Sequence, residues 1–371
     1  MGYRVHYLVE DFFSHLTDSL RQTCGDNGRV HAPPGLDNPL TPEFQQLGGA
    51  IQQAAQKITS EEARIELTSA AMRCATLGTS LQTWLTQDLA DAVYWIELSG
   101  RRRQNVRLNC APVEVADVLN EELFNRVRTC ILTSATLAVG QDDFQFTRSR
   151  LGLTAARELK LGSPFDYRNQ AQLILPEGMP DPTGDPARYE AAVCRHICRY
   201  VEQTAGRAFV LFTSYKMLNS CRHRLAGWFR ENQFSLYSQG DDLPRTAMLE
   251  RFRNDPAAVL FGTDSFWQGV DVPGDALQNV IITKLPFSVP DHPLLEARVE
   301  AIRRRGGNPF IQYQVPEAII KLKQGFGRLI RSRNDRGQVV ILDPRVRTKP
   351  YGRLFLQSLP DAEVIIDDAT D

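Results

Sequence analysis

Hydrophobic residues recur with one period in the first hundred positions of this chain and with another beyond them. Near the amino terminus, apolar residues return every three or four positions, which is typical of amphipathic helices. The segments with this spacing are 12–20, 44–58 and 61–85. A break rich in Gly, Pro and Asn lies at 25–42. We therefore expect a mainly helical first part, followed by a strand-like stretch at 93–97.

From about residue 108, short apolar runs alternate with segments of helical spacing. Strands are predicted at 129–132, 172–175, 208–212, 236–237, 258–261, 279–285 and 338–343. Helices are predicted at 113–124, 187–203, 217–232, 244–253, 293–305 and 316–333. The last strand, QVVILD, is almost continuously apolar, as expected of a strand that is buried on both faces. The alternation predicts an α/β fold with a mostly parallel sheet and helices on both of its faces.

Small polar residues follow several of the predicted strands. The groups are TSATL at 133–137, Thr213-Ser214, Gln239-Gly240, Gly262-Thr263-Asp264 and Asp343-Pro344. In parallel sheets, ligands bind beyond the carboxyl ends of the strands. We therefore expect these groups to converge at one edge of the sheet and, together with arginines, to form an anion-binding cleft.

The predicted helix at 316–333 has two distinct faces. One face is apolar and comprises Ile319, Leu322, Phe326 and Leu329. The other offers an amide and three cations, from Lys321, Gln324, Arg328 and Arg331. Gly325 and Gly327 interrupt the pattern at a cost of roughly 1 kcal/mol each relative to Ala, which indicates that another group approaches the helix backbone closely. The alternative is a solvated basic face on a packed helix.

Composition limits the classes of partner and location. The chain has 371 residues, of which 42% are hydrophobic and 23% charged, which fits one large domain or two to three smaller ones. The net charge is −1, so any nucleic-acid site must be a local basic patch. Seven scattered cysteines indicate reduced thiols in a cytoplasmic protein, and neither a signal peptide nor an apolar run of membrane-spanning length is evident.

Two clusters allow more than one interpretation. Cys194 and Cys198 lie one helical turn apart with His196 between them, and could bind a metal, although free cysteines are more commonly small buried hydrophobes. Phe266 and Trp267 are expected to anchor the core, with a stacking platform for nucleic-acid bases as the alternative.

Half of a nucleotide-hydrolysing site is missing from the sequence. No Gly-x-x-x-x-Gly-Lys-[Ser/Thr] loop is present, and no Gly-Lys dipeptide occurs. The Asp-Glu dipeptide that would hold Mg²⁺ and activate water is also missing. The chain therefore offers arginines suited to a γ-phosphate without the loop that cradles the phosphates.

Five stretches, taken together, resemble motifs III to VI of the DinG-type DNA helicases, the bacterial relatives of XPD in superfamily 2. They are TSATL at 133–137, LFTSY at 211–215, FWQGVDVPG at 266–274, KLPF at 284–287 and QGFGRLIR at 324–331. Order and spacing match from about residue 93 to residue 359. Gln268 stands where the family usually has Glu. The phosphate loop, the DExH box and the iron–sulfur cysteines of the family are not found in this chain.

The resemblance implies a division of the chain into three parts. Residues 1–107 would be a helical arch-like domain, residues 108–165 a remnant of the first RecA-like motor domain with motif III, and residues 166–371 the second RecA-like motor domain. The implied activity is that of a 5′→3′ ATP-dependent DNA helicase, monomeric, cytoplasmic and acting in DNA repair. It would use ATP and Mg²⁺, bind single-stranded DNA, and depend on an amino-terminal motor segment missing from this chain.

The resemblance also assigns roles to residues. Arg328 and Arg331 would be arginine fingers, Gln324, Gly269 and Asp271 would bind ATP, and Ser134 and Thr136 would couple ATP to DNA. Contacts to DNA are implied for Thr213, Ser214, Tyr215 and Thr263. No metal ligand is expected.

Whether this chain alone is an enzyme stays open, and we expect it to be inactive without the missing segment. The residues leave two other hypotheses: a non-enzymatic DNA-binding or scaffolding module derived from a helicase, and a recombinase-like subunit of another P-loop fold.

Overall fold

The chain folds into two units, one of which draws residues from two separate stretches of sequence. The computed structural model describes residues 2–20, 24–99, 105–140, 143–241, 243–267, 269, 272, 274–289 and 291–368. The first unit comprises Met1–Val118 and Val289–Gly307, and the second comprises Leu119–Ser288 and Asn308–Asp371. The domain boundaries implied by the family resemblance stay a prediction.

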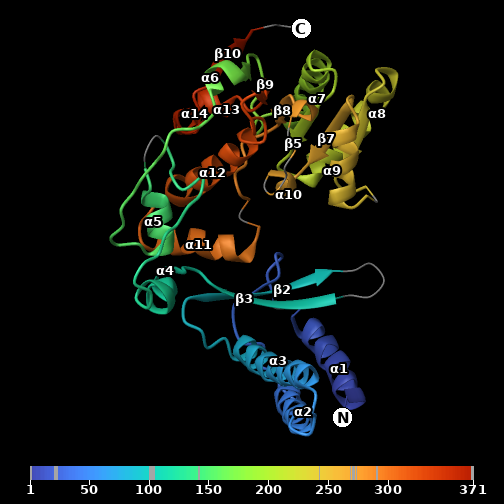
Figure 1. Ribbon diagram of the computed structural model, residues 1–371, viewed down its shortest axis with the longest axis vertical. Coiled ribbons are helices and arrows are strands. Elements are labelled where there is room, and N and C mark those ends of the chain that lie inside the picture. The colour runs from blue at the N-terminus through green and yellow to red at the C-terminus, as the bar shows by residue number, and fades with distance from the viewer. Residues whose placement is uncertain are drawn as a thin grey trace. The chain divides into compact units, whose positions relative to one another are not determined.

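The first unit combines helices with a small antiparallel sheet (Figure 1). Its helices are α1 (Gly2–Leu20), α2 (Leu40–Ala55), α3 (Glu61–Thr86), α4 (Ala116–Leu119) and α11 (Pro293–Arg304). Its strands follow the order β1 (Arg29–Val30), β2 (Ala92–Ser99) and β3 (Asn105–Pro112). The helices predicted near the amino terminus are confirmed, whereas β3 was not predicted.

Helix α11 belongs to the first unit because its inner face and its charged residues contact the sheet and its flanks. Ala297 and Ala301 pack with Trp95 of β2. Arg29 of β1, with a side chain only 13% exposed, lies 3.1 Å from Glu296 and 2.8 Å from Glu300. A basic residue that is paired twice in a partly buried position holds the two segments together.

The second unit is built on a seven-stranded parallel sheet, which confirms the predicted α/β class (Figure 1). The strand order is β10-β4-β9-β8-β5-β7-β6. The strands are β4 (Ala171–Pro176), β5 (Ala208–Leu211), β6 (Ser235–Ser238), β7 (Ala258–Gly262), β8 (Asn279–Ile282), β9 (Gly337–Ile341) and β10 (Glu363–Asp367). The helices are α5 (Gln145–Leu151), α6 (Tyr167–Gln170), α7 (Pro186–Gln203), α8 (Tyr215–Glu231), α9 (Arg245–Asn254), α10 (Asp264–Trp267), α12 (Val315–Phe326), α13 (Arg345–Thr348) and α14 (Gly352–Ser358).

Alternating strand residues divide the core of this unit into two layers. Phe209 and Leu211 of β5 face one layer, which α9, α12 and α14 complete. Val210 of the same strand faces the other layer, formed mainly with α7 and α8. Because side chains alternate along a strand, a strand that is apolar at every position is buried on both faces.

The strand predicted at 129–132 is wrong. These residues have no regular secondary structure and are exposed, with Ile131 80% accessible. A strand needs a hydrogen-bonded neighbour, and no strand in the described ranges pairs with this stretch. Upstream, the predicted helix at 113–124 forms only in part, as α4 and a π-helical turn over Asn120–Phe124.

Within the part of the chain that the structure describes, no helix combines the length and the apolarity needed to cross a membrane. The cytoplasmic location expected from the sequence stays a prediction.

Candidate functional site

Polar side chains from the ends of three adjacent strands meet in one hydrogen-bonded network. The carboxamide nitrogen of Gln239, just beyond β6, donates to the Tyr215 hydroxyl at 2.6 Å and to Ser265 Oγ at 3.0 Å. Its oxygen accepts from the Thr263 amide at 2.7 Å and from the Thr263 hydroxyl at 2.9 Å. The predicted convergence of polar groups beyond β5, β6 and β7 is therefore confirmed. We call these four residues the polar edge.

The amino terminus of α8 opens beside the polar edge. Ser214 caps this helix, since its hydroxyl accepts from the amide of Met217 at 3.3 Å. Ser214 and Tyr215 are exposed, and Thr213 is half-buried. A helix amino terminus carries partial positive charge and unpaired amides, so this end of α8 is suited to an anion.

Phe266 and Trp267 are core anchors, and the base-stacking alternative is wrong. Their exposures are 1% and 0%, so neither ring face is open to a base. The Trp267 indole nitrogen donates to the carbonyl of Phe212 at 3.1 Å. A side-chain carbon built on Gly325 would lie only 3.0 Å from the Trp267 ring. The close approach predicted for the α12 backbone is thus made by this indole.

The predicted helix at 316–333 is too long. Helix α12 ends at Phe326, and Gly327 caps it. Beyond this point the amides of Arg328 and Leu329 donate to carbonyls only three residues back, instead of four. The Asp335 carboxylate then accepts from the amides of Arg331 and Ser332 at 2.7 and 2.8 Å. An acceptor outside the helix competes with the helical carbonyls, so the segment leaves the helix. Arg328 and Arg331 therefore do not continue a cationic row on one helical face.

Arg328 is held inside the fold by a backbone carbonyl. Its side chain is 8% exposed, and Nε and Nη2 donate to the Trp267 carbonyl at 3.1 and 2.7 Å. This two-point contact joins the segment after α12 to α10, which directly follows β7. The guanidinium thus connects the sequence of motif VI to the polar edge.

Arg331 is exposed and lies on the loop that leads into β9. Gln170, at the entry to β4, donates to the carbonyls of Ser332 and Asp335 at 3.0 and 2.9 Å. The backbone of this loop is therefore fixed near the amino ends of β4 and β9, whereas the polar edge lies beyond the carboxyl ends of β5, β6 and β7. The structure does not gather Arg331 and the polar edge into the single cleft that the sequence predicts.

The Asp335 carboxylate keeps its charge in a buried position. Burial alone would raise its pKa, but hydrogen bonds from the Ser332 hydroxyl and from the amides of Arg331 and Ser332 hold the pKa below its ordinary value of 3.8. The nearby charge of Arg331 acts in the same direction. The loop that carries Arg331 is therefore organised around one ionised side chain.

Three residues predicted to bind ATP have different surroundings. Gln324 on α12 is half-buried, and its carboxamide oxygen has no hydrogen-bond partner in the described part of the chain. Gly269 has a φ of +64°, which favours glycine, and its carbonyl accepts from Arg245 Nη2 at 2.8 Å. Asp271 lies outside the described residues. No pattern in the sequence predicted the contact between Arg245 and the Gly269 carbonyl.

The predicted coupling residues lie on an exposed turn that is tied to α12. The Ser134 hydroxyl lies 3.2 Å from that of Thr136 and accepts from the Thr136 amide at 3.2 Å. Two residues further on, the Ala138 carbonyl accepts from Lys323 Nζ at 3.0 Å. Burial lowers the pKa of Lys323. The sequence placed Lys323 in the helix but gave no indication of this contact.

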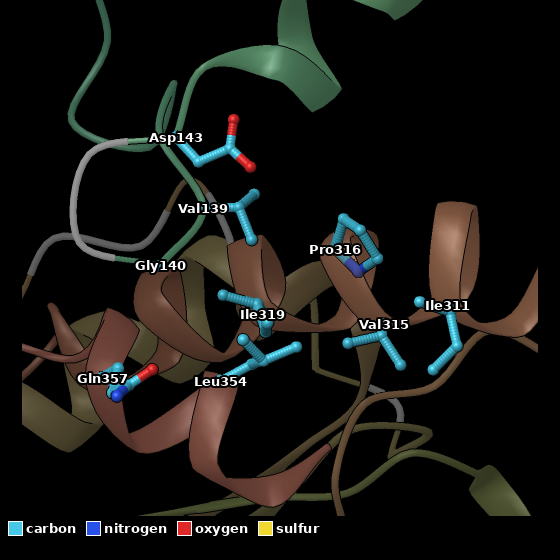
Figure 2. Close-up of a pocket in the computed structure, with 9 residues that line it drawn as sticks. All are labelled: Val139, Gly140, Asp143, Ile311, Val315, Pro316, Ile319, Leu354 and Gln357. Carbon is cyan, nitrogen blue, oxygen red and sulfur yellow. The ribbon is translucent and has the colours of Figure 1, made fainter. Parts of the chain in front are cut away.

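A groove of about 340 Å³ lies between α12, α14 and the loop after this turn (Figure 2). Ile319 and Leu354 lie side by side in it, and the Asp143 carboxylate lies at one end. Its lining residues are Val139, Gly140, Asp143, Ile311, Val315, Pro316, Ile319, Leu354 and Gln357. This lining offers no cation to a phosphate, so the groove does not suit the triphosphate of a nucleotide.

The Cys194 and Cys198 thiols are in the core layer beside α7 rather than in a ligand cluster. Cys194 is buried, Cys198 is partly buried, and the His196 ring stacks on Tyr200 at 5.9 Å. Among the residues that the structure describes, no group of three His, Cys, Asp or Glu side chains could hold a metal ion.

Sequence comparison relates the chain to helicases. The model of the helicase C-terminal domain matches residues 197–362. The chain is 45% identical over 271 residues to the ATP-dependent DNA helicase YoaA of Escherichia coli K12, a match covering 72% of this chain and 41% of that protein. It is 38% identical over 280 residues to the 3′-5′ exonuclease DinG of Bacillus subtilis 168, covering 74% of this chain and 30% of that protein. The chain thus spans less than half the length of these curated relatives.

Comparison of structures gives the same fold. A solved XPD helicase structure superposes with a TM-score of 0.60 at 15% identity, covering 96% of this chain and 61% of that one. At this identity the likeness concerns the fold.

Proposed function

We infer that this chain belongs to the DinG-type, XPD-related helicases of superfamily 2 and matches their carboxyl-terminal portion. On this premise, the chain supplies the second motor domain of an ATP-dependent DNA helicase. The observation that carries the proposal is the link from Arg328 to the Trp267 carbonyl. This contact joins an exposed arginine loop to a polar strand edge, and so offers a path between a nucleotide surface and a DNA surface.

The nucleotide surface is the loop that carries Arg331. An exposed guanidinium on a loop organised by Asp335 is suited to reach a γ-phosphate held by another segment, and to neutralise the charge that develops during transfer. Arg328 would position this loop, because its own donors are used within the fold. The carboxamide oxygen of Gln324 has no hydrogen-bond partner among the described residues, but it is buried, so a nucleotide would reach it only if the surrounding groups moved.

The phosphate loop and the ligands for Mg²⁺ would come from an amino-terminal motor segment outside this chain. The described residues contain no cluster suited to a metal ion, so we derive no step through Mg²⁺ from them. The family resemblance assigns Gly269 and Asp271 to ATP binding, and Ser134 and Thr136 to coupling. The bond from Lys323 to Ala138 supports this role for the turn, since it connects the turn to α12.

The DNA surface is the polar edge together with the start of α8. Thr213, Ser214 and Tyr215 offer hydroxyls and amides, which suit contacts to phosphates and sugars without reading sequence. Such contacts suit tracking along single-stranded DNA. The DNA contact predicted for Thr263 is wrong, because Thr263 is only 4% exposed and its amide and hydroxyl both donate to Gln239. The 5′→3′ polarity and a monomeric state follow from the resemblance.

A second candidate function is a DNA-binding module without hydrolysis. It is favoured by the sequence itself, which has no phosphate loop. Both candidates expect this chain to bind single-stranded DNA.

Phosphate release from ATP, measured with this chain alone and single-stranded DNA, tests the half-site. We expect no turnover above background, because the groups that hold the β- and γ-phosphates are missing. Turnover at the rate of an intact helicase would contradict the proposal. Restored hydrolysis on adding an amino-terminal motor segment from a relative would favour the motor domain over the non-enzymatic module.

A further inference from the structure

A half-buried lysine lies at the carboxyl edge of the sheet, near two acids that other donors hold. Lys284 lies two residues beyond β8 and is half-buried. No hydrogen bond or ion pair holds its amine in the part of the chain that the structure describes. Burial and the charge of Arg345 lower its pKa, and the charges of Asp343 and Asp181 oppose this shift only in part. Burying an unpaired charge is unfavourable, so this position needs an explanation outside fold stability.

One of the two carboxylates that attract Lys284 is already bound by other groups. Asp343, which is 0% exposed, accepts from Arg345 Nη2 at 2.6 Å and Nε at 2.9 Å. It also accepts from the amide of Leu285 at 2.9 Å. A bidentate arginine and a backbone amide satisfy such a carboxylate. Asp343 therefore pairs directly with Arg345 and acts on Lys284 only through space.

A second acid nearby is also engaged elsewhere. Asp181 accepts from the amide of Thr183 at 2.8 Å and lies 3.8 Å from Lys349 Nζ. Its bonds to Thr183 lower its pKa. Asp343 and Asp181 thus attract Lys284 without binding its amine, which is left to pair with an incoming anion.

The sheet topology places Lys284 in line with the proposed DNA surface. Strand β8 pairs with β5, and β5 pairs with β7. Neighbouring strands lie roughly 4.8 Å apart, so their carboxyl ends form a row. Along this row Thr263 follows β7, Thr213 and Ser214 follow β5, and Lys284 follows β8. A backbone that crosses the edge from the amino terminus of α8 next meets this lysine.

We propose that Lys284 binds one phosphodiester of single-stranded DNA, extending the polar edge by one strand. This inference rests on the proposed function and adds a contact that the polar edge lacks, since its four members are uncharged. Binding a phosphate would place a negative charge directly against the Lys284 amine, which has no ion pair among the described residues. In the absence of DNA, a half-buried lysine without an ion pair lowers the stability of the fold, as groups that serve function often do.

Titration of this chain with a labelled oligothymidylate at several salt concentrations tests the proposal. Counterion release gives a slope of about −0.7 per neutralised phosphate for single strands, so Lys284→Gln should make the slope less negative by about 0.7 and weaken binding at low salt. Lys284→Arg should retain most of the slope. Lys57→Gln, which removes an exposed lysine from the first unit, is the matched control and should change neither quantity.

Two further measurements separate the possible causes. The first is competition between tripolyphosphate and the oligonucleotide, measured with the unsubstituted chain and with Lys284→Gln. If Lys284 binds a DNA phosphate, tripolyphosphate should displace the oligonucleotide from the two proteins with similar strength. If Lys284→Gln lost as much affinity for tripolyphosphate as for DNA, Lys284 would instead be assigned to a free polyphosphate. Lys284→Met should not lower the melting temperature, because it removes an unpaired buried charge. A clear drop in melting temperature would overturn the assignment in favour of a structural role.

An unchanged salt slope in Lys284→Gln, with normal binding by the unsubstituted chain, would overturn this inference alone. If the unsubstituted chain does not bind DNA at all, the proposed function and this inference both fail.

Discussion

Arg328 belongs to a motif associated with catalysis, yet its contacts in the structure are those of a residue that positions other segments. The sequence places it in the same row as Arg331, and the resemblance assigns both to catalysis. In the structure its donors reach the Trp267 carbonyl, and its side chain is 8% exposed. A buried guanidinium with these bonds is suited to positioning. The sequence could not distinguish the two arginines, because the distinction depends on which carbonyl lies opposite.

Arg328→Ala should lower the free energy of unfolding by roughly 1.5–3 kcal/mol, the range for losing hydrogen bonds to a charged group. The Trp267 carbonyl would be left buried and unpaired, because Trp267 itself is 0% exposed. Urea unfolding of the two proteins measures the difference. Arg333→Ala, at an exposed position, serves as the control. Equal stability of Arg328→Ala and the parent would show that this contact is not formed in solution.

Asp335 gives the loop of Arg331 a pH dependence. Its folded pKa lies below the ordinary 3.8, so the unfolded state binds more protons as the pH falls. The stabilisation is therefore complete above about pH 5 and declines as the pH falls through 3.8 toward the lowered value. Thermal unfolding from pH 3 to pH 7 should show this decline, and Asp335→Asn should flatten it. A parallel decline in both proteins would assign the acid sensitivity to other groups.

At the scale of elements, helix α12 was predicted correctly at its start and incorrectly at its end. The apolar spacing through Phe326 is genuine, and Ile319, Leu322 and Phe326 are all 0% exposed. Periodicity alone extends the helix to residue 333, because Leu329 also fits the pattern. Termination depends on the Asp335 carboxylate accepting two backbone amides, and hydrophobic periodicity contains no information about a side-chain acceptor.

The two glycines of this stretch serve different purposes. Gly327 caps the helix, and Gly325 admits the Trp267 ring. Gly325→Ala should gain roughly 1 kcal/mol of helix propensity but lose about 1–3 kcal/mol to overpacking, and so should destabilise the protein overall. Denaturant unfolding provides the measurement.

A matched substitution is available in another helix. Gly49 lies in α2, and nothing is within 4 Å of a side-chain carbon built there. Gly49→Ala should therefore show the propensity gain without the clash and stabilise the protein by up to roughly 1 kcal/mol. If both substitutions were stabilising, the indole would not be packed against α12 as described.

For the whole molecule, the pattern of strands and helices was enough to predict the parallel sheet and its polar edge. Short apolar runs and the polar groups after strands are local properties, and the chain displays them directly. The strand at 129–132 failed because a strand also requires a neighbour, which no local pattern supplies. The return of α11 to the first unit was not foreseeable either, since it depends on Arg29 meeting Glu296 and Glu300 across some 270 positions.

The same limit explains the separation of Arg331 from the polar edge. The strand predicted at 338–343 follows Arg331, so the arginine was assigned to the cleft by its place in the row of cations and not by the end of a strand. Arg331 precedes β9 and so lies near its amino end, whereas Thr263 follows β7. The structure therefore offers two surfaces where the sequence predicted one cleft. This arrangement supports the proposal of separate nucleotide and DNA surfaces, with Arg328 between them.

The most direct test of this account is the kinetic effect of Arg331→Ala in a protein that joins this chain to the proposed amino-terminal motor segment, with Arg333→Ala as the control. Nucleotide affinity and DNA-stimulated ATP turnover are measured for both proteins. We expect turnover to fall by about 10³-fold or more in Arg331→Ala with nearly unchanged nucleotide affinity, because an arginine finger stabilises the transition state. Turnover comparable to that of Arg333→Ala, or a loss of affinity as large as the loss of turnover, would contradict it.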